Sequence, residues 1–246
     1  MKSSGNPVAP GDYPASPRLG FLDGDLLAYP AAAKLEKEND FEQVKKYLDD
    51  KVLSVIEDFC LDDLVIFLTP GKNFRHEVYP LYKANREATQ APRWLAPCKE
   101  YLRDKWGAYA ERPYECDDLL GVALSTDPGA ILLSYDKDLK QVPGWHGDIR
   151  DTRLLFVTED EGTRFFLRQL LSGDSTDNCP GIYRCGPAKA NKWFDQYGWT
   201  LENAAVAYWL AGYTWEYFTQ MYKCLYILRK KELSWPELDK LCTPWS

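Results

Sequence analysis

Carboxylates recur in this chain at places where apolar runs end. Asp23 follows the apolar run Leu19–Leu22, and Asp136 and Asp138 follow a second run, Ala130–Leu133. In open α/β sheets, ligands bind at the carboxyl ends of the strands. Each of these acids alone also fits a turn or helix-capping role. The two strand-end groups are therefore candidate ligand-binding residues. Whether they bind a ligand or only form turns depends on where the other acids of the chain lie.

Two further acidic groups lie where helices are expected to begin. The segment RPYECDDLLGVAL places Glu115, Asp117 and Asp118 in a first helical turn, where the helix dipole favours anions. The segment GDSTDN adds Asp174 and Asp177 in a turn or at a helix start. Helix capping could explain each group, although three acids within four residues exceed what one cap needs.

Together these eight carboxylates predict a cation site. If they converge in a partly desolvated cleft, their mutual repulsion is relieved only when their pKa values rise or when cations enter. Oxygen ligands without histidine or cysteine favour Mg²⁺ or Mn²⁺. Two such ions can clamp the attacking and leaving oxygens of a phosphodiester. We therefore expect two divalent ions and phosphoryl transfer to water.

The composition is that of a globular protein. The chain has 246 residues, of which 45% are hydrophobic and 14% aromatic. Seven cysteines without a CxxC pair and only two histidines argue against a disulfide framework and a Cys/His zinc site, and a reducing cytoplasm is expected. The longest apolar stretch, near 204–213, is too short to cross a bilayer, so neither secretion nor membrane insertion is expected.

Charge is unevenly distributed along the chain. The net charge is −7, yet residues 72–112 carry nine basic and five acidic side chains, whereas residues 113–180 carry six basic and thirteen acidic ones. An acidic metal cleft beside a basic phosphate track would produce this pattern, and so would solvated charge runs on an ordinary surface.

The apolar pattern predicts an α/β fold with a mainly parallel central sheet and flanking helices. Residues 1–17 contain four prolines and are expected to form a flexible arm outside the fold. Helical spacing of apolar residues predicts a helix over Phe41–Phe59. After Gly186 only helical patterns remain, such as Trp215–Lys231, which predicts a helical C-terminal lobe. The expected strands are Leu19–Leu22, Leu64–Leu68, Ala108–Ala110, Ala130–Leu133 and Leu154–Val157.

Five motifs between Leu19 and Phe194 resemble, in order, those of the FEN-like 5′ nucleases. This family comprises flap endonucleases, the 5′ nuclease domain of bacterial DNA polymerase I and phage 5′→3′ exonucleases, and the chain looks most like the exonucleases of short-tailed phages. FLDGD resembles the first acidic motif, FRHEVYPLYKANR the entry to the helical arch, and YECDD the Glu-x-Asp-Asp helix. YDKDLKQV resembles the Asp-Lys-Asp motif, and GDSTDNCPGI resembles the last metal ligands leading into a helix-three-turn-helix.

The resemblance implies a role for each matching residue. The direct or water-mediated metal ligands would be Asp23, Glu115, Asp117, Asp118, Asp136, Asp138, Asp174 and Asp177. Lys83 and Arg86 match the arch cations that engage the scissile phosphate, and Tyr82 is a candidate for stacking on a base. The DNA-binding turn and its helix would contribute Gly181, Arg184, Gly186, Lys189 and Lys192.

The resemblance also implies cofactors, partners and an organisation. Two Mg²⁺ ions are expected in the site, with Mn²⁺ as a substitute, and a K⁺ ion at the helix-three-turn-helix. The partner would be duplex DNA with 5′ ends, nicks or flaps, cleaved in the 5′→3′ direction, with RNA primers as further candidate substrates. Residues 18–178 would form the nuclease core, with the arch at about 82–112, and residues 179–246 the helix-three-turn-helix and a helical C-terminal region.

The chain departs from the family pattern at three places. Arg184 and Cys185 stand where the family commonly has a glycine and a small aliphatic residue, so the charge of Arg184 is expected to replace a lost backbone contact. Leu68, Thr69 and Pro70 stand where family members usually carry an aspartate, so the first metal is expected to bind more weakly or to use Thr69 or water. Pro92 and Pro97 interrupt the arch segment, which argues against one long arch helix.

Two alternatives remain open from the sequence. A HAD-like phosphatase would use the DGD and GDSTD segments, but that reading leaves the acids at 115–118, 136 and 138 without a function. A catalytically weakened, DNA-binding relic of the nuclease family would explain the absent aspartate, although a relic has no reason to keep repelling charges together.

Overall fold

The computed structural model describes residues 18–86, 90–241 and 245 of the 246-residue chain. The expected N-terminal arm, residues 1–17, lies outside the described residues, as do residues 87–89 of the expected arch. The described residues form two compact units. The sheet unit contains residues 18–71, 90–159 and 227–231, and the helical unit contains the other described residues.

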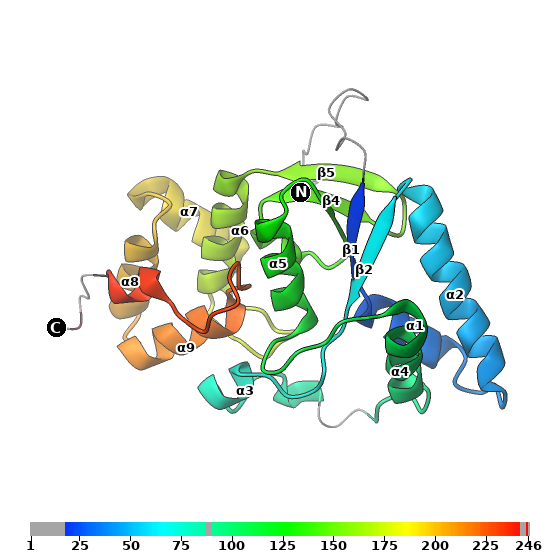
Figure 1. Ribbon diagram of the computed structural model, residues 1–246. Helices are drawn as coiled ribbons and strands as arrows, with labels where there is room; N and C mark the ends of the chain where they lie inside the picture. The colour runs from blue at the N-terminus through cyan, green and yellow to red at the C-terminus, as the bar shows by residue number, and fades with distance from the viewer. Residues whose placement is uncertain (1–17, 87–89, 242–244, 246) are drawn as a thin grey trace. The chain divides into compact units, whose positions relative to one another are not determined.

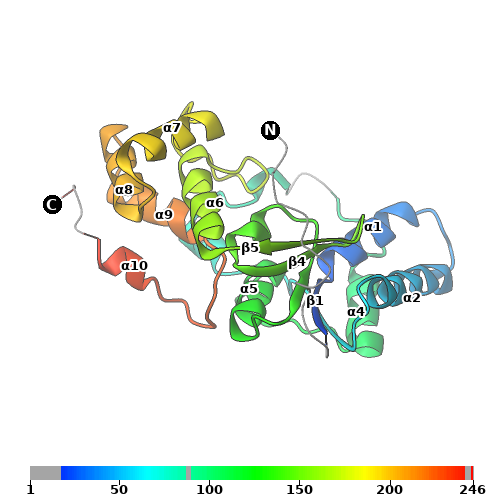
Figure 2. The same cartoon turned by 90° about the horizontal axis from the view of Figure 1, so that it is seen from above.

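The sheet unit is built on five strands in the order β2-β1-β3-β4-β5. β1, β2, β3 and β4 run parallel. β5 pairs antiparallel with β4, and these two strands lie side by side in Figure 2. The mainly parallel sheet and mixed α/β class predicted from the sequence are therefore confirmed. The strands are β1 Leu19–Asp23, β2 Asp63–Phe67, β3 Ile131–Leu133, β4 Gly144–Asp148 and β5 Arg153–Val157.

Helices cover the sheet on two sides. Figure 1 shows α5 on one side of β1 and β2, with α1, α2 and α4 on the other. Parallel strands covered on both faces read as continuous apolar runs, which is why the central strands were recognisable in the sequence. The helices of this unit are α1 Asp25–Lys34, α2 Phe41–Asp58, α4 Leu95–Trp106 and α5 Cys116–Thr126, with a 3₁₀ helix at Asp138–Gln141.

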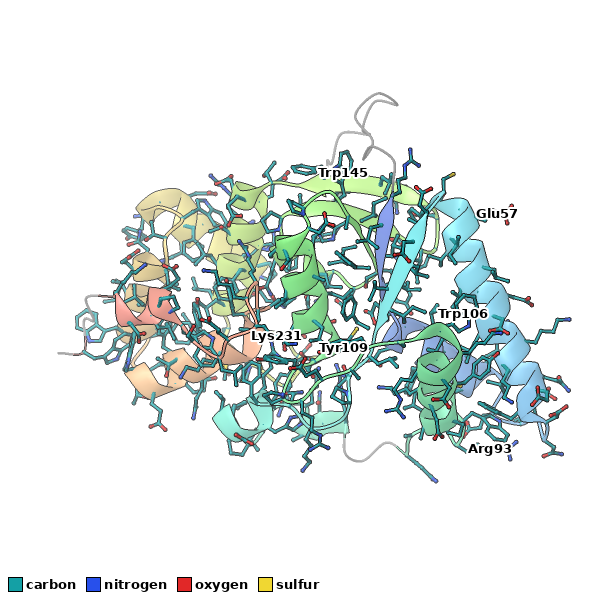
Figure 3. The ribbon with its side chains drawn as sticks, in the orientation of Figure 1. Glu57, Arg93, Trp106, Tyr109, Trp145 and Lys231 are labelled. Atoms are coloured by element: carbon teal, nitrogen blue, oxygen red, sulfur yellow. The ribbon has the colours of Figure 1, made fainter. Side chains whose placement is uncertain are left out.

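The helix predicted over Phe41–Phe59 is confirmed as α2. Asp40 caps its start by accepting a hydrogen bond from the Glu42 N–H at 3.0 Å. Its buried face packs on the core beside β1 and β2 and consists of Val44, Leu48, Val52 and Val55. Asp49, also on α2, accepts a hydrogen bond from the indole N–H of Trp106, the last residue of α4 and one of the side chains labelled in Figure 3.

One strand prediction was wrong, and one strand of the sheet was missed. Ala108–Ala110 forms only an isolated bridge between Phe67 and Tyr109, so the backbone pairing does not extend into a strand. β4 was missed because its sequence, GWHGD, lacks an apolar run. Gly147 is needed there because an added Cβ would lie 2.6 Å from the ring of Phe59. Because an aromatic ring packs closely against β4 at this position, a glycine stands where an ordinary strand would carry an apolar side chain, and the apolar pattern of a strand is lost.

The helical unit contains the remaining helices. They are α3 Arg75–Val78, a 3₁₀ helix at Ala84–Arg86, α6 Glu159–Ser172, whose first residue lies in the sheet unit, α7 Pro187–Tyr197, α8 Leu201–Leu210, α9 Trp215–Leu225 and α10 Pro236–Asp239. Its core is aromatic: Tyr208, Phe194 and Phe218 are fully buried, and the Tyr208 hydroxyl donates to the Leu170 carbonyl at 2.6 Å. No strand follows Gly186 in the described residues, which agrees with the predicted helical character of this region.

The helix predicted over Trp215–Lys231 is shorter than expected. α9 ends at Leu225, and the Arg75 guanidinium donates to the carbonyls of Cys224 and Tyr226. Residues 227–231 then belong to the sheet unit, where Lys231 donates to the Tyr109 hydroxyl at 3.1 Å (Figure 3). Among the helices that the structure describes, none has the length and apolarity needed to cross a membrane.

Candidate functional site

Asp23 is the last residue of β1 and is almost completely buried, with 3% of its surface exposed. One carboxylate oxygen accepts hydrogen bonds from the N–H groups of Asp25 and Leu26, at 3.1 and 3.3 Å. The other accepts from the Ser134 hydroxyl at 3.2 Å. Gly24 allows this arrangement because an added Cβ would lie 2.7 Å from the Phe67 carbonyl of β2.

The Asp23 carboxyl has an unusual pKa. It is raised from an ordinary 3.8 to about 7, first by burial and then by the charges of Asp25 and Asp136, which together outweigh the lowering effect of hydrogen bonds from Leu26 and Cys116. A buried carboxylate under these conditions favours a proton or a bound cation. Its donor atoms are oxygens, so the environment suits a hard divalent ion.

Asp136 lies close to Asp23 through Ser134. The Asp136 N–H donates to the Ser134 hydroxyl oxygen at 3.0 Å, and that hydroxyl donates to Asp23. Asp138 continues the same turn, since its N–H donates to an Asp136 carboxylate oxygen at 2.9 Å. The carboxyl ends of β1 and β3 therefore bring together acids that are far apart in sequence, as the strand-end positions predict.

Glu115 and Asp118 form the start of α5. They make a capping box, in which the Glu115 side chain accepts from the Asp118 backbone and the Asp118 side chain accepts from the Glu115 N–H at 3.1 Å. Asp118 is fully buried, and its second oxygen accepts from the Leu228 N–H at 3.2 Å. Both acids thus stabilise local structure, whereas Asp117 is half-buried and lies outside the capping box.

Cys116 lies between this cap and Asp23. Its thiol is 3.5 Å from Asp23 Oδ1 and 3.2 Å from the Phe67 carbonyl oxygen. Burial and the charges of Asp23, Asp25 and Asp117 raise the pKa of the thiol well above its usual range, so it stays protonated. The Cys116 N–H donates to the Thr69 hydroxyl at 2.9 Å, which ties α5 to the end of β2.

Asp25 and Lys99 are two charged residues at this site that the sequence reasoning missed. Asp25 accepts from the Thr69 N–H at 3.1 Å, and its other oxygen lies 2.7 Å from the Lys99 ammonium. Lys99, on α4, also donates to the Thr69 carbonyl at 2.9 Å. The Asp-Gly-Asp spacing at the end of β1 was the signal available for Asp25; Lys99 had none.

In the helical unit, Asp174 is held in a tight turn. It exchanges two backbone hydrogen bonds with Cys179, at 2.7 and 2.8 Å. Its side chain accepts from the Thr176 N–H at 2.7 Å and from the Gln169 amide at 3.2 Å. Only 5% of its surface is exposed, so this carboxylate is positioned rather than mobile.

Asp177 is bound by the three residues predicted to act in the arch. The Tyr82 hydroxyl donates to it at 3.0 Å, Arg86 donates at 2.8 Å, and the Lys83 ammonium lies 3.7 Å away. The Lys83 N–H also donates to the Asp177 carbonyl at 2.9 Å. Tyr82 is 2% exposed, so stacking on a base stays a prediction that requires this segment to move.

The glycine-bounded turn has one closely packed end and one open end. Gly181 has φ +62°, and an added Cβ would lie 2.5 Å from the Gly173 nitrogen, so only glycine fits. Gly186 precedes α7, and an added Cβ there would meet nothing within 4 Å. The basic residues of this segment are exposed, namely Arg184, Lys189 and Lys192. The open end is therefore accessible to a ligand.

The predicted residues thus fall into two groups. The sheet unit holds Asp23, Glu115, Asp117, Asp118, Asp136 and Asp138, and the helical unit holds Asp174, Asp177 and all the predicted cationic and turn residues. In the part of the chain that the structure describes, no three His, Cys, Asp or Glu side chains are arranged as a metal-holding group. Around Asp23, burial and the charges of neighbouring acids favour a bound cation.

Comparison with known proteins supports the resemblance drawn from the motifs. No family model matches the chain. It is 28% identical over 187 residues to an exodeoxyribonuclease of Enterobacteria phage T3, covering 65% of this chain and 61% of that protein. It is 32% identical over 152 residues to DNA polymerase I of Rhizobium leguminosarum, covering 54% of this chain and 15% of the polymerase. The chain therefore spans less than two thirds of each of these relatives.

Solved structures share the fold. The T5 5′-exonuclease with bound zinc ions superposes with a TM-score of 0.62 at 19% identity, covering 85% of this chain and 86% of that one. The catalytic core of Rad2 in complex with a DNA substrate gives a TM-score of 0.54 at 12% identity, covering 93% of this chain and 79% of that one. Together with the sequence relatives, these structures confirm the resemblance to the FEN-like 5′ nucleases.

Proposed function

We propose that this chain is a divalent-metal-dependent 5′→3′ nuclease that hydrolyses phosphodiester bonds of duplex DNA from 5′ ends. The T3 relative is an exodeoxyribonuclease, and structures with this fold were solved with metal ions, with DNA, or with both. The observation that carries the proposal is the Asp23–Ser134–Asp136 group, in which a buried carboxylate with a raised pKa lies beside other acids at the carboxyl ends of β1 and β3.

In this proposal, carboxylates of the sheet unit hold divalent cations. Asp23 and Asp136 would be primary ligands, and Asp117 and Asp138 are half-buried acids that could bind directly or through water. Two Mg²⁺ ions, replaceable by Mn²⁺, would lower the pKa of a water and offset charge on the phosphate. Glu115 and Asp118 already bond to backbone N–H groups, so we propose that they act mainly by fixing α5.

Asp174 and Asp177 of the helical unit are proposed as further metal-binding carboxylates. Gln169 and the Thr176 N–H hold Asp174 in one orientation, which fixes the direction of its carboxylate. Asp177 is presently neutralised by Lys83 and Arg86. A phosphate that drew these two cations away would leave the Asp177 carboxylate ready for a metal ion, so substrate and metal binding would assist each other.

Lys83 and Arg86 are proposed to stabilise negative charge on the scissile phosphate. An ammonium and a guanidinium suit this purpose because both keep their charge at neutral pH. Arg86 is exposed, with 51% of its side-chain surface accessible, whereas Lys83 is more enclosed at 19%. Arg86 is therefore the better placed of the two to make a first contact with an incoming strand.

The turn from Gly181 to Gly186 and the start of α7 are proposed to bind the DNA backbone. Arg184, Lys189 and Lys192 are exposed there, and the open position at Gly186 lets a phosphate approach the main chain. A K⁺ ion at this turn would fit the same purpose. Such contacts do not read bases, so we expect little sequence preference and a steep dependence on salt.

Product analysis on matched substrates tests the proposal. Blunt, nicked and 5′-flap duplexes carrying a 5′ label are incubated with Mg²⁺, using wild type and Asp136→Asn. We expect labelled mononucleotides from blunt or nicked ends, or short labelled oligonucleotides from flaps, and no product from Asp136→Asn. Intact DNA at all enzyme concentrations, with binding retained in EDTA, would contradict nuclease activity and favour a DNA-binding relic.

A further inference from the structure

We propose that Asp25 contributes its carboxylate charge to the cation site of Asp23, and that Lys99 positions Asp25 and competes with the cation for it. This inference rests on the proposed function, because it concerns the same metal site. It assigns a role to two residues outside the predicted ligand set, one on α1 and one on α4.

Asp25 is placed by the backbone rather than by chance packing. Gly24 brings β1 against the Phe67 carbonyl, to which its N–H donates at 2.8 Å, and Asp25 follows as the first residue of α1. The Thr69 N–H then fixes one carboxylate oxygen at 3.1 Å. The carboxylate is thus delivered to the end of β2 from the neighbouring strand, two residues beyond the strand end at Phe67.

The charge of Asp25 reaches Asp23 directly. The Asp25 backbone N–H donates to Asp23 Oδ1 at 3.1 Å, so the two acids adjoin at the start of α1. The Cys116 thiol lies 3.5 Å from the same Asp23 oxygen, and the Cys116 N–H donates to the hydroxyl of Thr69, whose own N–H donates to the Asp25 carboxylate. A divalent ion bound at Asp23 would therefore experience attraction from Asp25, whether Asp25 binds it directly or through water.

Lys99 is the cation already present beside these acids. Its ammonium lies 2.7 Å from Asp25 and donates to the Thr69 carbonyl at 2.9 Å, and about a quarter of its side chain is exposed, 26%. Lys99 thus contacts both Asp25 and Thr69, whose N–H donates to Asp25, so Lys99 holds the carboxylate in place. Because it also offsets the Asp25 charge, removing Lys99 should strengthen the attraction for a divalent ion.

Two substitutions, one that removes a negative charge and one that removes a positive charge, distinguish this electrostatic role from a structural one. Asp25→Asn keeps an oxygen that can accept from Thr69 but removes the charge, and Lys99→Met keeps the length of the side chain but removes its charge. Asp58→Asn is the matched control. Asp58 is an exposed acid on α2, and its carboxylate accepts a hydrogen bond from the Ser54 hydroxyl, one turn earlier in the same helix, at 3.0 Å.

The measurement is Mn²⁺ binding by isothermal titration calorimetry on the full chain at constant pH and salt. We expect Asp25→Asn to weaken Mn²⁺ binding at least about tenfold, Lys99→Met to strengthen it several-fold, and Asp58→Asn to match wild type. Thermal unfolding without metal accompanies each titration, and the midpoint of Asp25→Asn should equal or exceed that of wild type because repulsion of Asp23 is relieved.

The outcomes distinguish the inference from the proposed function. If wild type binds Mn²⁺ and Asp23→Asn does not, but Asp25→Asn binds as wild type does, the role of Asp25 is refuted and the metal site stands. Equal weakening by Asp25→Asn and Lys99→Met, with lower unfolding midpoints for both, would indicate a merely structural pair and also refute it. Absence of Mn²⁺ binding by wild type would refute the proposed metal-dependent function itself.

Discussion

Lowering the pH should weaken metal binding at Asp23 much more than at an ordinary carboxylate. A cation must replace the proton of this group, whose pKa burial and Asp25 raise to about 7. Between pH 7.5 and pH 5.5 the apparent Mn²⁺ affinity should therefore fall about 25-fold, or about 4- to 80-fold if the pKa is one unit lower or higher. A carboxyl with the usual pKa would change the affinity by only about 2% over the same range.

Calorimetric titration of Mn²⁺ at pH 7.5, 6.5 and 5.5 measures this effect. Repeating the pH 6.5 titration in two buffers of different ionisation enthalpy counts the protons released, and about 0.8 proton per site is expected from Asp23, whose pKa is about 7. An affinity that changes less than about twofold across the range, with no proton release, would refute the raised pKa and with it the argument that Asp23 requires a cation.

The stability of the metal-free protein gives an independent check with a definite sign. A carboxyl whose folded pKa is raised contributes stability that is fully present below its ordinary pKa of 3.8 and is lost progressively as pH rises to about 7. From pH 6 to pH 8 the loss at Asp23 amounts to about 1.4 kcal/mol. Burial lowers the pKa of His146 to about 4, which adds about 0.8 kcal/mol in the opposite direction. Asp23→Asn retains the His146 contribution, so urea unfolding of the variant and wild type isolates the Asp23 term.

Three further predictions follow from the helical unit. Lys83→Ala and Arg86→Ala should each slow single-turnover cleavage at least about tenfold, and unchanged rates would contradict their role at the phosphate. Arg86→Ala should barely change the urea midpoint, because an ion pair made by a half-exposed side chain adds little stability. Gly181→Ala should destabilise the protein by more than about 2 kcal/mol in urea unfolding, since φ is +62° and the Cβ would lie 2.5 Å from a backbone nitrogen; a neutral effect would show that the turn relaxes easily. Arg184→Ala and Lys189→Ala should each lower the slope of log affinity for duplex DNA against log salt by about 0.9, measured by anisotropy; an unchanged slope would mean that the residue does not contact phosphate.

The strand-end acids were predictable because β1 and β3 are continuous apolar runs. Their pattern identifies parallel, doubly covered strands, and the position of Asp23 and Asp136 at the strand ends then follows from topology. β4 was not predictable in this way, because Gly147 is chosen by the close approach of the Phe59 ring, which only the folded structure reveals. A strand whose residues are chosen by contacts with a neighbouring element shows no alternation of apolar residues in its own sequence.

The functional contacts were harder to predict than the ligand types. The capping box of Glu115 and Asp118 is local, and a helix-capping role for these acids was already recognisable in the sequence. The pairing of Asp177 with Arg86 spans 91 residues, and that of Asp25 with Lys99 joins α1 to α4; neither leaves a local pattern. Spacing therefore identifies which residues can do chemistry, whereas the partners that set their charge state emerge only from the fold.

The most direct test of the account is single-turnover cleavage of a 5′-labelled duplex by wild type and Asp23→Asn, with DNA binding measured by anisotropy in EDTA. The account predicts that Asp23→Asn binds DNA as wild type does and releases no labelled product with Mg²⁺, because the variant lacks the buried charge that holds the ion. Cleavage by Asp23→Asn at the wild-type rate, or cleavage by wild type in EDTA, would contradict it.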